Sequence, residues 1–186
     1  MLYFRITKHI FINYALLKFM GYIANYCDKK RLEKILPYIS KEMKILDLGC
    51  GSGWLTKSLK SFQFDCIGVD TTVENNDLFH KGTADNIPFP DNFFDCLIMI
   101  EVIEHIKPSC YSEINRVLKK NGIIILSTIL PKSDKLVHFL SKIGLVDPYV
   151  TPHINLVCID TLPWNMIEKS SILLLDQFGV FRKTHD

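Results

Sequence analysis

The sequence carries little net charge and no long apolar run. Its 22 Lys and Arg and 20 Asp and Glu leave a formal net charge of +2 over 186 residues, so no global field attracts nucleic acid. Arg5, Lys8 and Lys18 interrupt the apolar N-terminus, and nowhere do about 18 uninterrupted apolar residues follow one another, as a membrane-spanning helix needs. No convincing cleavage site of small residues follows this segment. We therefore expect no membrane span and no export.

Paired cysteine motifs are also missing. The six cysteines are scattered with no C-x-x-C pair, and Cys66 and Cys96 lie in apolar, strand-like runs where a free cysteine behaves as a small hydrophobe. An even count is compatible with disulfides, but this placement favours reduced thiols and a cytoplasmic location. With 48% hydrophobic residues the chain can form a packed core, which excludes wholesale disorder.

Apolar runs alternate with amphipathic segments along the chain. Strands are predicted at 44–48, 64–70, 78–81, 94–100 and 123–130, with a sixth at 172–177. Helices are predicted over 2–26, after a cap at Asp28, over 53–61, from Pro108 to Asn121-Gly122, after Ser133 and over 162–169. This alternation predicts a Rossmann-like, doubly wound, mostly parallel α/β sheet with helices on both faces. Residues 1–43 then form a helical extension or lid, and 44–186 form the main domain.

A glycine-rich turn follows the first predicted strand, in Asp47-Leu48-Gly49-Cys50-Gly51-Ser52-Gly53. Glycines at a strand-to-helix turn let the backbone approach a ligand closely, although a tight packing turn also uses them. The dinucleotide fingerprint G-x-G-x-x-G is not met, because Trp54 stands where its last glycine belongs. No Lys or Arg lies between Gly49 and Trp54. The turn is therefore not built to hold a phosphate by charge.

Four acids lie at or just after the ends of predicted strands: Asp47, Asp70, Asp85 and Glu101. Ligands of parallel sheets bind beyond the carboxyl ends of the strands, so we expect these side chains to ring one crevice. Asp70 can accept hydrogen bonds from two ribose hydroxyls, and Asp85 from an exocyclic amine such as that of adenine. Alternatively, Asp70 starts a turn and Asp85 caps one. Four acids repel a pyrophosphate and attract a cation, so the crevice suits an adenosine ligand with a positive centre.

Several segments together resemble one enzyme family. Residues 45–53 resemble the first motif of class I S-adenosylmethionine-dependent methyltransferases, and Asp70 matches the ribose-binding acid of that family. Residues 84–91 and 93–95 resemble the adenine-side segment of its ubiquinone-biosynthesis-like (Methyltransferase type 11) branch. Residues 101–105, Glu-Val-Ile-Glu-His, resemble the segment that follows the fourth strand in that branch. The resemblance covers about 44–130, with the segments in the family's order.

The resemblance implies an enzyme that transfers a methyl group from S-adenosyl-L-methionine to an O, N or C nucleophile of a small-molecule or lipid-like acceptor. No metal ligands are expected. The residues that it places around the cofactor are Asp47, Gly49, Cys50, Gly51, Gly53, Asp70, Thr71, Ala84, Asp85, Asn86 and Glu101. Two alternatives stay open: a partner subunit of the same fold without activity, and a nicotinamide-dependent oxidoreductase.

The chain departs from the family at two places. About eight residues separate Asp70 from the third predicted strand, so the usual helix there is missing or reduced. The chain also ends soon after the sixth predicted strand, which puts the family's antiparallel seventh strand in doubt. An exposed sheet edge would then be covered or paired, for example in a homodimer.

The resemblance leaves the general base and the acceptor open. His105 is a candidate base beside the expected methyl group, although a helix-start histidine bonded to backbone is an equal alternative, and His153 is a second candidate. The Asn/Asp-Pro-Pro-Tyr segment of nucleic-acid methyltransferases is missing, since residues 100–103 read Ile-Glu-Val-Ile. This disfavours a nucleic-acid partner. Residues 1–26 form either a lid over the acceptor or a peripheral contact with a membrane surface.

Overall fold

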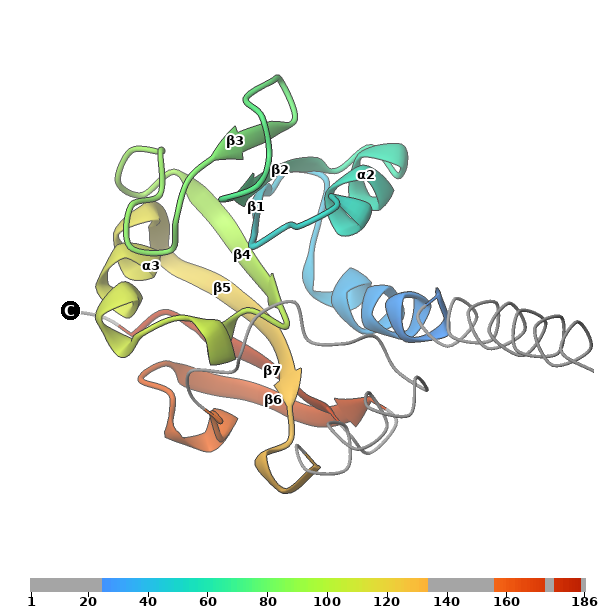
Figure 1. Cartoon of the computed structure of the whole chain (residues 1–186), viewed down its shortest axis with the longest axis vertical. Helices are drawn as coiled ribbons and strands as arrows, with labels where there is room; N and C mark the ends of the chain where they lie inside the picture. The colour runs from blue at the N-terminus through green and yellow to red at the C-terminus, as the bar shows by residue number, and fades with distance from the viewer. Residues whose placement is uncertain (1–24, 134–155, 173–175, 185–186) are drawn as a thin grey trace, which may run out of the picture.

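The computed structural model describes residues 25–133, 156–172 and 176–184. In this part of the chain, seven strands form one sheet in the order β3-β2-β1-β4-β5-β7-β6 (Figure 1). β1 to β5 pair in parallel, whereas β7 is antiparallel to both β5 and β6. The predicted mostly parallel α/β sheet is confirmed. The strands are Lys44–Leu48 (β1), Asp65–Asp70 (β2), Phe79–Lys81 (β3), Phe94–Ile100 (β4), Leu118–Ile129 (β5), Asn165–Ile172 (β6) and Asp176–Arg182 (β7).

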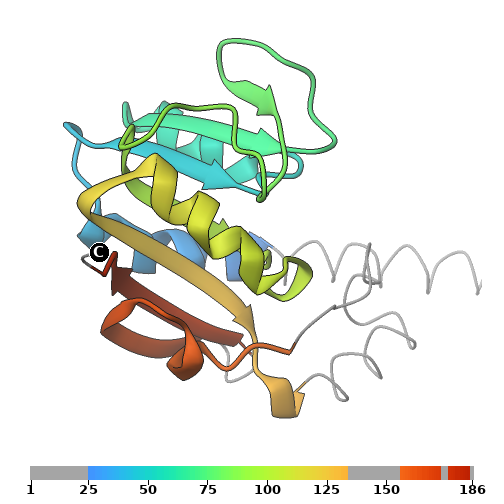
Figure 2. The ribbon, with the colours of Figure 1, turned by 90° about the vertical axis from the view of Figure 1, so that its left-hand side faces the viewer.

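Helices cover both faces of the sheet. Residues 25–35 are helical, and this helix and α2 (Trp54–Ser61) lie on one face, while α3 (Tyr111–Val117) lies on the other (Figures 1 and 2). The short 3-10 turns are Leu36–Tyr38 (η1), Ile103–His105 (η2), Pro108–Cys110 (η3), Pro131–Ser133 (η4) and Ile159–Thr161 (η5). No helix among the described residues is long and apolar enough to cross a membrane.

The apolar run of β4 explains its central place. Cys96, Leu97, Ile98 and Met99 are all buried. Leu97 and Met99 pack into the core on the α3 face, and Cys96 and Ile98 into the core on the α2 face. A strand that is covered on both faces has no solvent side, so it needs apolar residues at successive positions. All six cysteines of the chain are free thiols.

The C-terminal part of the sheet differs from the expectation. Residues 162–169 are not a helix, because residues 165–172 form β6 in a hairpin with β7. The sheet therefore has its antiparallel strand, and the doubt about a seventh strand was wrong. β7 carries the apolar residues Phe178, Val180 and Phe181, which are wholly buried between β5 and β6. β6 becomes the edge strand, and the homodimer expected from an exposed edge stays a prediction.

Two helix boundaries were also predicted wrongly. Asp28 does not cap the second helix, because residues 25–27 are already helical. α3 ends at Val117 rather than at Asn121-Gly122, since β5 begins at Leu118. Asn121 has a φ of 65° within β5, a left-handed conformation that asparagine tolerates better than most residues. The helix predicted after Ser133 lies outside the described residues.

The connection between β2 and β3 contains no helix, as its length predicts. Residues 71–78 form an open loop that is held by two asparagine side chains. Asn76 Oδ1 accepts hydrogen bonds from the backbone N–H of Leu78 (2.8 Å) and Phe79 (3.0 Å). Asn75 Oδ1 accepts one from the N–H of Lys81 (2.7 Å). The two asparagine side chains thus accept hydrogen bonds from backbone N–H groups on the side of β3 that does not face β2.

Candidate functional site

A cavity of about 650 Å³ opens beyond the carboxyl ends of β1, β2 and β4. This is where ligands of open parallel sheets bind, and the volume lies within the usual range of small-molecule sites. The lining residues come from the ends of β1 and β2 and from the loops that follow β1, β2, β3 and β4. They are Leu48, Gly49, Gly51, Val69, Asp70, Thr71, Thr72, Gly82, Thr83, Ala84, Asp85, Glu101, Val102, His105, Ile106, Lys107, Ser109 and Cys110.

The glycine turn holds the backbone close to the wall of this cavity. Gly49 has a φ of +75°, and a Cβ atom there would lie 2.4 Å from Cγ2 of Val102. Its N–H donates to the carbonyl of Val69 at 2.7 Å, which ties the turn to the end of β2. Gly51 has a φ of +49°, and a Cβ atom there would meet no atom within 4 Å. Glycine is therefore required by packing at position 49, while position 51 leaves open space on the cavity side.

Asp70 binds the glycine turn to the loop that follows β2. Its Oδ2 accepts a hydrogen bond from the N–H of Gly51 at 2.9 Å. Its Oδ1 accepts from the N–H and the hydroxyl of Thr72, at 2.9 and 2.7 Å. Burial raises the pKa of Asp70, but these hydrogen bonds outweigh it and hold the pKa below the usual value. Asp70 is thus a carboxylate at neutral pH, and Oδ2, which accepts one hydrogen bond from Gly51, keeps a lone pair for a ligand.

Asp47 does not reach the cavity, so the prediction that four acids ring it was wrong. The side chain is buried, and its Oδ2 accepts hydrogen bonds from the N–H (3.1 Å) and hydroxyl (2.6 Å) of Thr56. Burial raises its pKa to about 6. Asp47 therefore fixes the first turn of α2 against β1, beneath the glycine turn. Three further predicted cofactor residues are also not among those that line the cavity: Cys50, Gly53 and Asn86.

On the opposite wall, Ala84 and Asp85 line the cavity as predicted. The Thr83 hydroxyl donates a hydrogen bond to Oδ1 of Asp85. Thr71, also predicted, lines the cavity from the β2–β3 loop. The described acids that line the cavity are therefore Asp70, Asp85 and Glu101.

Glu101 directly follows β4, and both its backbone and its carboxylate are held by neighbouring groups. Its φ of 55° lies in the left-handed region, which is costly for a residue with a side chain. Its N–H donates to the carbonyl of Ser127 at 3.0 Å, and its Oε1 accepts from the Ser127 hydroxyl at 3.0 Å. Arg31 also donates to Oε1, at 3.0 Å, from the helix of residues 25–35. Burial above all, and then the nearby Glu104 carboxyl, raise the pKa of Glu101 to about 7.

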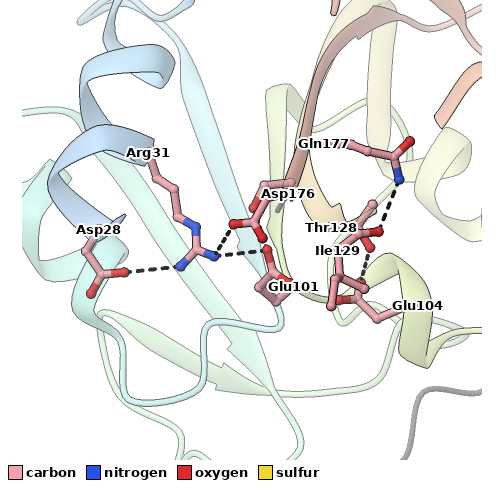
Figure 3. A network of polar contacts seen from close by, with 9 residues as sticks. Asp28, Arg31, Glu101, Glu104, Thr128, Ile129, Asp176 and Gln177 are labelled. Carbon is pink, nitrogen blue, oxygen red and sulfur yellow. Dashed lines mark hydrogen bonds and ion pairs between the residues drawn. The ribbon is translucent and has the colours of Figure 1, made fainter. Parts of the chain in front are cut away.

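Arg31 joins three acids from three parts of the chain (Figure 3). Besides Glu101, its guanidinium contacts Asp176 at the start of β7 (3.1 Å) and Asp28 on its own helix (3.4 Å). Burial raises the pKa of Asp176 to about 6, with Glu101 adding to the rise. Neither Arg31 nor Asp176 was predicted as a site residue. They are 70 and 75 residues from Glu101 in the sequence (31, 101 and 176), and no local motif marks them.

Glu104 is wholly buried behind Glu101. Its Oε2 accepts a hydrogen bond from the Thr128 hydroxyl at 2.9 Å (Figure 3). Its Oε1 has no hydrogen-bond partner among the described residues. Burial raises the pKa of Glu104. A second carboxyl therefore lies in the same low-dielectric region as Glu101, where two neighbouring negative charges are unfavourable.

The two histidine candidates have different outcomes. His105 ends η2 and lines the cavity, together with Ile106 and Lys107. His153 lies outside the described residues. Among the described residues, no group of three or more His, Cys, Asp or Glu side chains could hold a metal ion.

The chain matches a family model described as a methyltransferase domain over residues 19–168. It belongs to this methyltransferase family. The match spans the glycine turn, all three lining acids and the helix that carries Arg31. The family does not favour a nicotinamide-dependent oxidoreductase, which the absence of a basic residue between Gly49 and Trp54 also disfavours.

Individual relatives are similar over part of their length. The chain is 30% identical over 125 residues to an uncharacterized methyltransferase, YcgJ, of Bacillus subtilis, which covers 58% of the chain and 49% of that protein. It is 35% identical over 106 residues to a ubiquinone biosynthesis O-methyltransferase of Rickettsia typhi, covering 49% of the chain and 42% of that protein. The chain thus spans about half the length, or less, of these curated relatives.

The same fold occurs in a solved complex. A putative methyltransferase bound to the Trm112 methyltransferase activator of Haloferax volcanii superposes with a TM-score of 0.70. The superposition covers 94% of this chain and 96% of that one, at 14% identity. At this level of identity the likeness shows the fold.

Proposed function

We propose that the chain transfers a methyl group from S-adenosyl-L-methionine to an O, N or C nucleophile of a small-molecule or lipid-like acceptor. One observation carries the proposal: a single cavity at the carboxyl ends of the strands is lined by a glycine turn without basic residues and by three acids. Family membership supports methyl transfer as the reaction class. The cavity supplies the reason to expect this donor.

The lining residues fit an adenosyl sulfonium. Asp70, which is ionised, and Asp85 both line the cavity. Asp70 would accept hydrogen bonds from the ribose hydroxyls, and Asp85 would accept one from the exocyclic amine. Apolar side chains between them, including Leu48, Val69 and Val102, suit an adenosine ring. Gly51 leaves open space for the methionine part of the ligand. The glycine turn has no basic residue with which to hold a pyrophosphate, and Lys107 is the single Lys or Arg among the described residues that line the cavity.

When bound, the cofactor supplies a methyl group on a positively charged sulfur. The acceptor's nucleophile would bond to the methyl carbon in line with the sulfur, which would leave as a neutral thioether. The protein's part is mainly alignment, which can supply about 7–11 kcal/mol of a barrier. A general base adds about 10²–10⁴-fold. His105 and Glu101 both line the cavity and can hold the acceptor's proton. The name of the Rickettsia relative supports a lipid-like acceptor and an oxygen nucleophile.

Calorimetry with S-adenosylmethionine and S-adenosylhomocysteine tests this proposal on the full chain. We expect both ligands to bind with micromolar dissociation constants. Release of S-adenosylhomocysteine during incubation with a panel of phenolic and prenylated phenolic acceptors then tests for transfer. If neither ligand binds at high micromolar concentration, the proposal fails and the alternative of an inactive partner subunit is favoured.

A further inference from the structure

The wall formed by Glu101 belongs to a cluster with more acids than bases. Three carboxyl groups, from Asp28, Glu101 and Asp176, contact one guanidinium, that of Arg31, and the carboxyl of Glu104 lies near that of Glu101 (Figure 3). The side chain of Arg31 is 15% exposed, and its Nε has no partner among the described residues. One cation cannot neutralise the three carboxylates that contact it, and Glu104 adds a fourth acid next to Glu101. The cluster lacks positive charge.

Glu101 alone connects this cluster to the cavity. Its side chain is 33% exposed, and the residue lines the cavity, whereas Asp28, Arg31, Glu104 and Asp176 do not. The end of β4 and the bond from Ser127 fix its position. A positive charge that enters the cavity therefore meets the cluster through the Glu101 carboxylate. S-adenosylhomocysteine carries the same ammonium and carboxylate groups as the donor but a neutral sulfur, so it lacks only the attraction at the sulfur.

We propose that Glu101 makes this cavity select the positively charged adenosyl sulfonium over the neutral thioether that methyl transfer leaves behind. The inference rests on the proposed function, because it assumes that the adenosyl donor binds in this cavity. It assigns Glu101 as a specificity-determining residue: it favours binding of the donor and release of the spent product. The reaction itself removes the charge that the cluster attracts.

The ionisation of Glu101 supports this assignment. The titratable groups that face it are Arg31 and Cys27 on the helix of residues 25–35, Glu104 on η2 and Asp176 on β7. His105 and Lys107 line the same cavity. Its pKa of about 7 means that the carboxyl is largely neutral below pH 6 and ionised above pH 8. A cation in the cavity favours the ionised form and lowers this pKa. By linkage, affinity for the cation must rise with pH through this range.

The test is a calorimetric titration of the full chain with S-adenosylmethionine and with S-adenosylhomocysteine. For the wild type, we expect the affinity for S-adenosylmethionine to rise about fivefold from pH 5.5 to pH 7.0, and that for S-adenosylhomocysteine to change less than about twofold. At pH 7.5, Glu101→Gln should weaken S-adenosylmethionine binding about tenfold and leave S-adenosylhomocysteine binding nearly unchanged. Because both proteins receive the same ligands, titration of the ligands themselves cancels.

Asp85→Asn is the matched control, since Asp85 is a lining acid on the adenine side of the cavity. It should weaken both ligands by the same factor and keep the wild-type pH dependence. If Glu101→Gln also weakens both ligands equally, or if the wild type shows one pH dependence for both, the inference is overturned. If the Glu101 variant does not fold, the same series on His105→Asn decides the question: the difference between the two ligands in pH dependence should persist without the imidazole, and its loss would overturn the inference. Binding of neither ligand would instead overturn the proposed function.

Discussion

Arg31 and Glu101 lie 70 residues apart in the sequence, and their side chains meet at 3.0 Å beside the cavity. This ion pair connects the helix of residues 25–35 to the end of the central strand β4. The same helix places Ile35, which is wholly buried, in the core with Ile45 and Phe178. The helix is thus fixed by apolar packing on one side and by charge on the other. It reaches the cavity only through the contact of Arg31 with Glu101, which lines it.

Arg31→Met should destabilise the fold by about 2–4 kcal/mol at pH 7.5, because it leaves Glu101 and Asp176 without their cation. The destabilisation from an unpaired carboxylate is smaller here than at a fully buried site, because solvent reaches part of the Glu101 side chain. Urea unfolding followed by circular dichroism measures this. The destabilisation should shrink at pH 5, because carboxyl groups with pKa values of about 7 and about 6 are then protonated.

Lys30→Met is the control for this variant. Lys30 is the neighbouring residue on the same helix, and its partner is the exposed Glu33 at 2.7 Å. Exposed pairs of this kind contribute little to stability, so we expect no clear change. Equal effects of the two substitutions would show that the Arg31 network has no special role.

Asp70→Ala should weaken S-adenosylmethionine binding by about 10–100-fold, which corresponds to about 1.4–2.8 kcal/mol. The substitution removes a carboxylate that faces the ligand and also the hydrogen bonds that hold Gly51 and Thr72. Calorimetry at constant pH measures the loss. We expect a larger effect than from His153→Ala and a much larger one than from Glu74→Ala, an exposed acid in the same loop. A larger effect at His153 would mean that the cofactor binds elsewhere.

The central part of the fold and much of the cavity can be predicted from the sequence because their signals are local. The apolar run at Phe94–Ile100 predicts the bounds of β4 as the structure has them. The glycines, Asp70, Asp85 and Glu101 stand next to predicted strand ends, and the topology of a parallel sheet brings such ends together. Asp47 is the exception among the acids near strand ends, because it does not line the cavity. Its position at a strand end does not reveal that its side chain turns toward Thr56.

The C-terminal hairpin and the Arg31 network depend on contacts between distant segments. Residues 165–172 include Met, Glu and Lys, which favour helices, yet they form a strand because β7 offers a partner. Pairing and burial override local propensity in such segments. Likewise, nothing near Arg31 in the sequence indicates that Glu101 and Asp176 will lie beside it.

Asp47→Asn should flatten the pH dependence of stability between pH 4 and pH 6. The folded pKa of Asp47 is about 6, against an ordinary value of 3.8. The folded state therefore holds a proton that the unfolded state has lost, so this group makes stability fall as pH rises through that window. The full effect is about 3 kcal/mol. Thermal or urea unfolding of both proteins across this range measures it.

Asp70→Asn is a control, because the Asp70 carboxyl contributes a pH dependence of stability with the opposite sign. The pKa of Asp70 is lowered in the fold, so its contribution to stability is present at neutral pH and is lost as the pH falls. This variant should reduce stability at pH 7 and change it little at low pH. If Asp47→Asn instead behaves like Asp70→Asn, the Asp47 carboxyl is stabilised as an anion and its burial does not control its pKa.

Gly49→Ala and Gly51→Ala should separate the folding role of the glycine turn from its binding role. Both positions have positive φ, so each alanine costs about 1–2 kcal/mol of backbone strain. At position 49 the added methyl also collides with Val102, so Gly49→Ala should lose clearly more stability. At position 51 the methyl enters open space at the cavity wall, so Gly51→Ala should remain folded and bind S-adenosylmethionine more weakly.

A second substitution checks the cause of the Gly49 effect. In the Gly49→Ala/Val102→Ala double variant, the methyl groups that the new Cβ would meet at 2.4 and 3.1 Å are gone. Part of the lost stability should then return. The double variant should lose less unfolding free energy than the sum of the losses of the two single variants. Strict additivity would mean that the left-handed backbone alone excludes alanine at position 49. In that case the contact between the turn and the segment after β4 does not determine the residue.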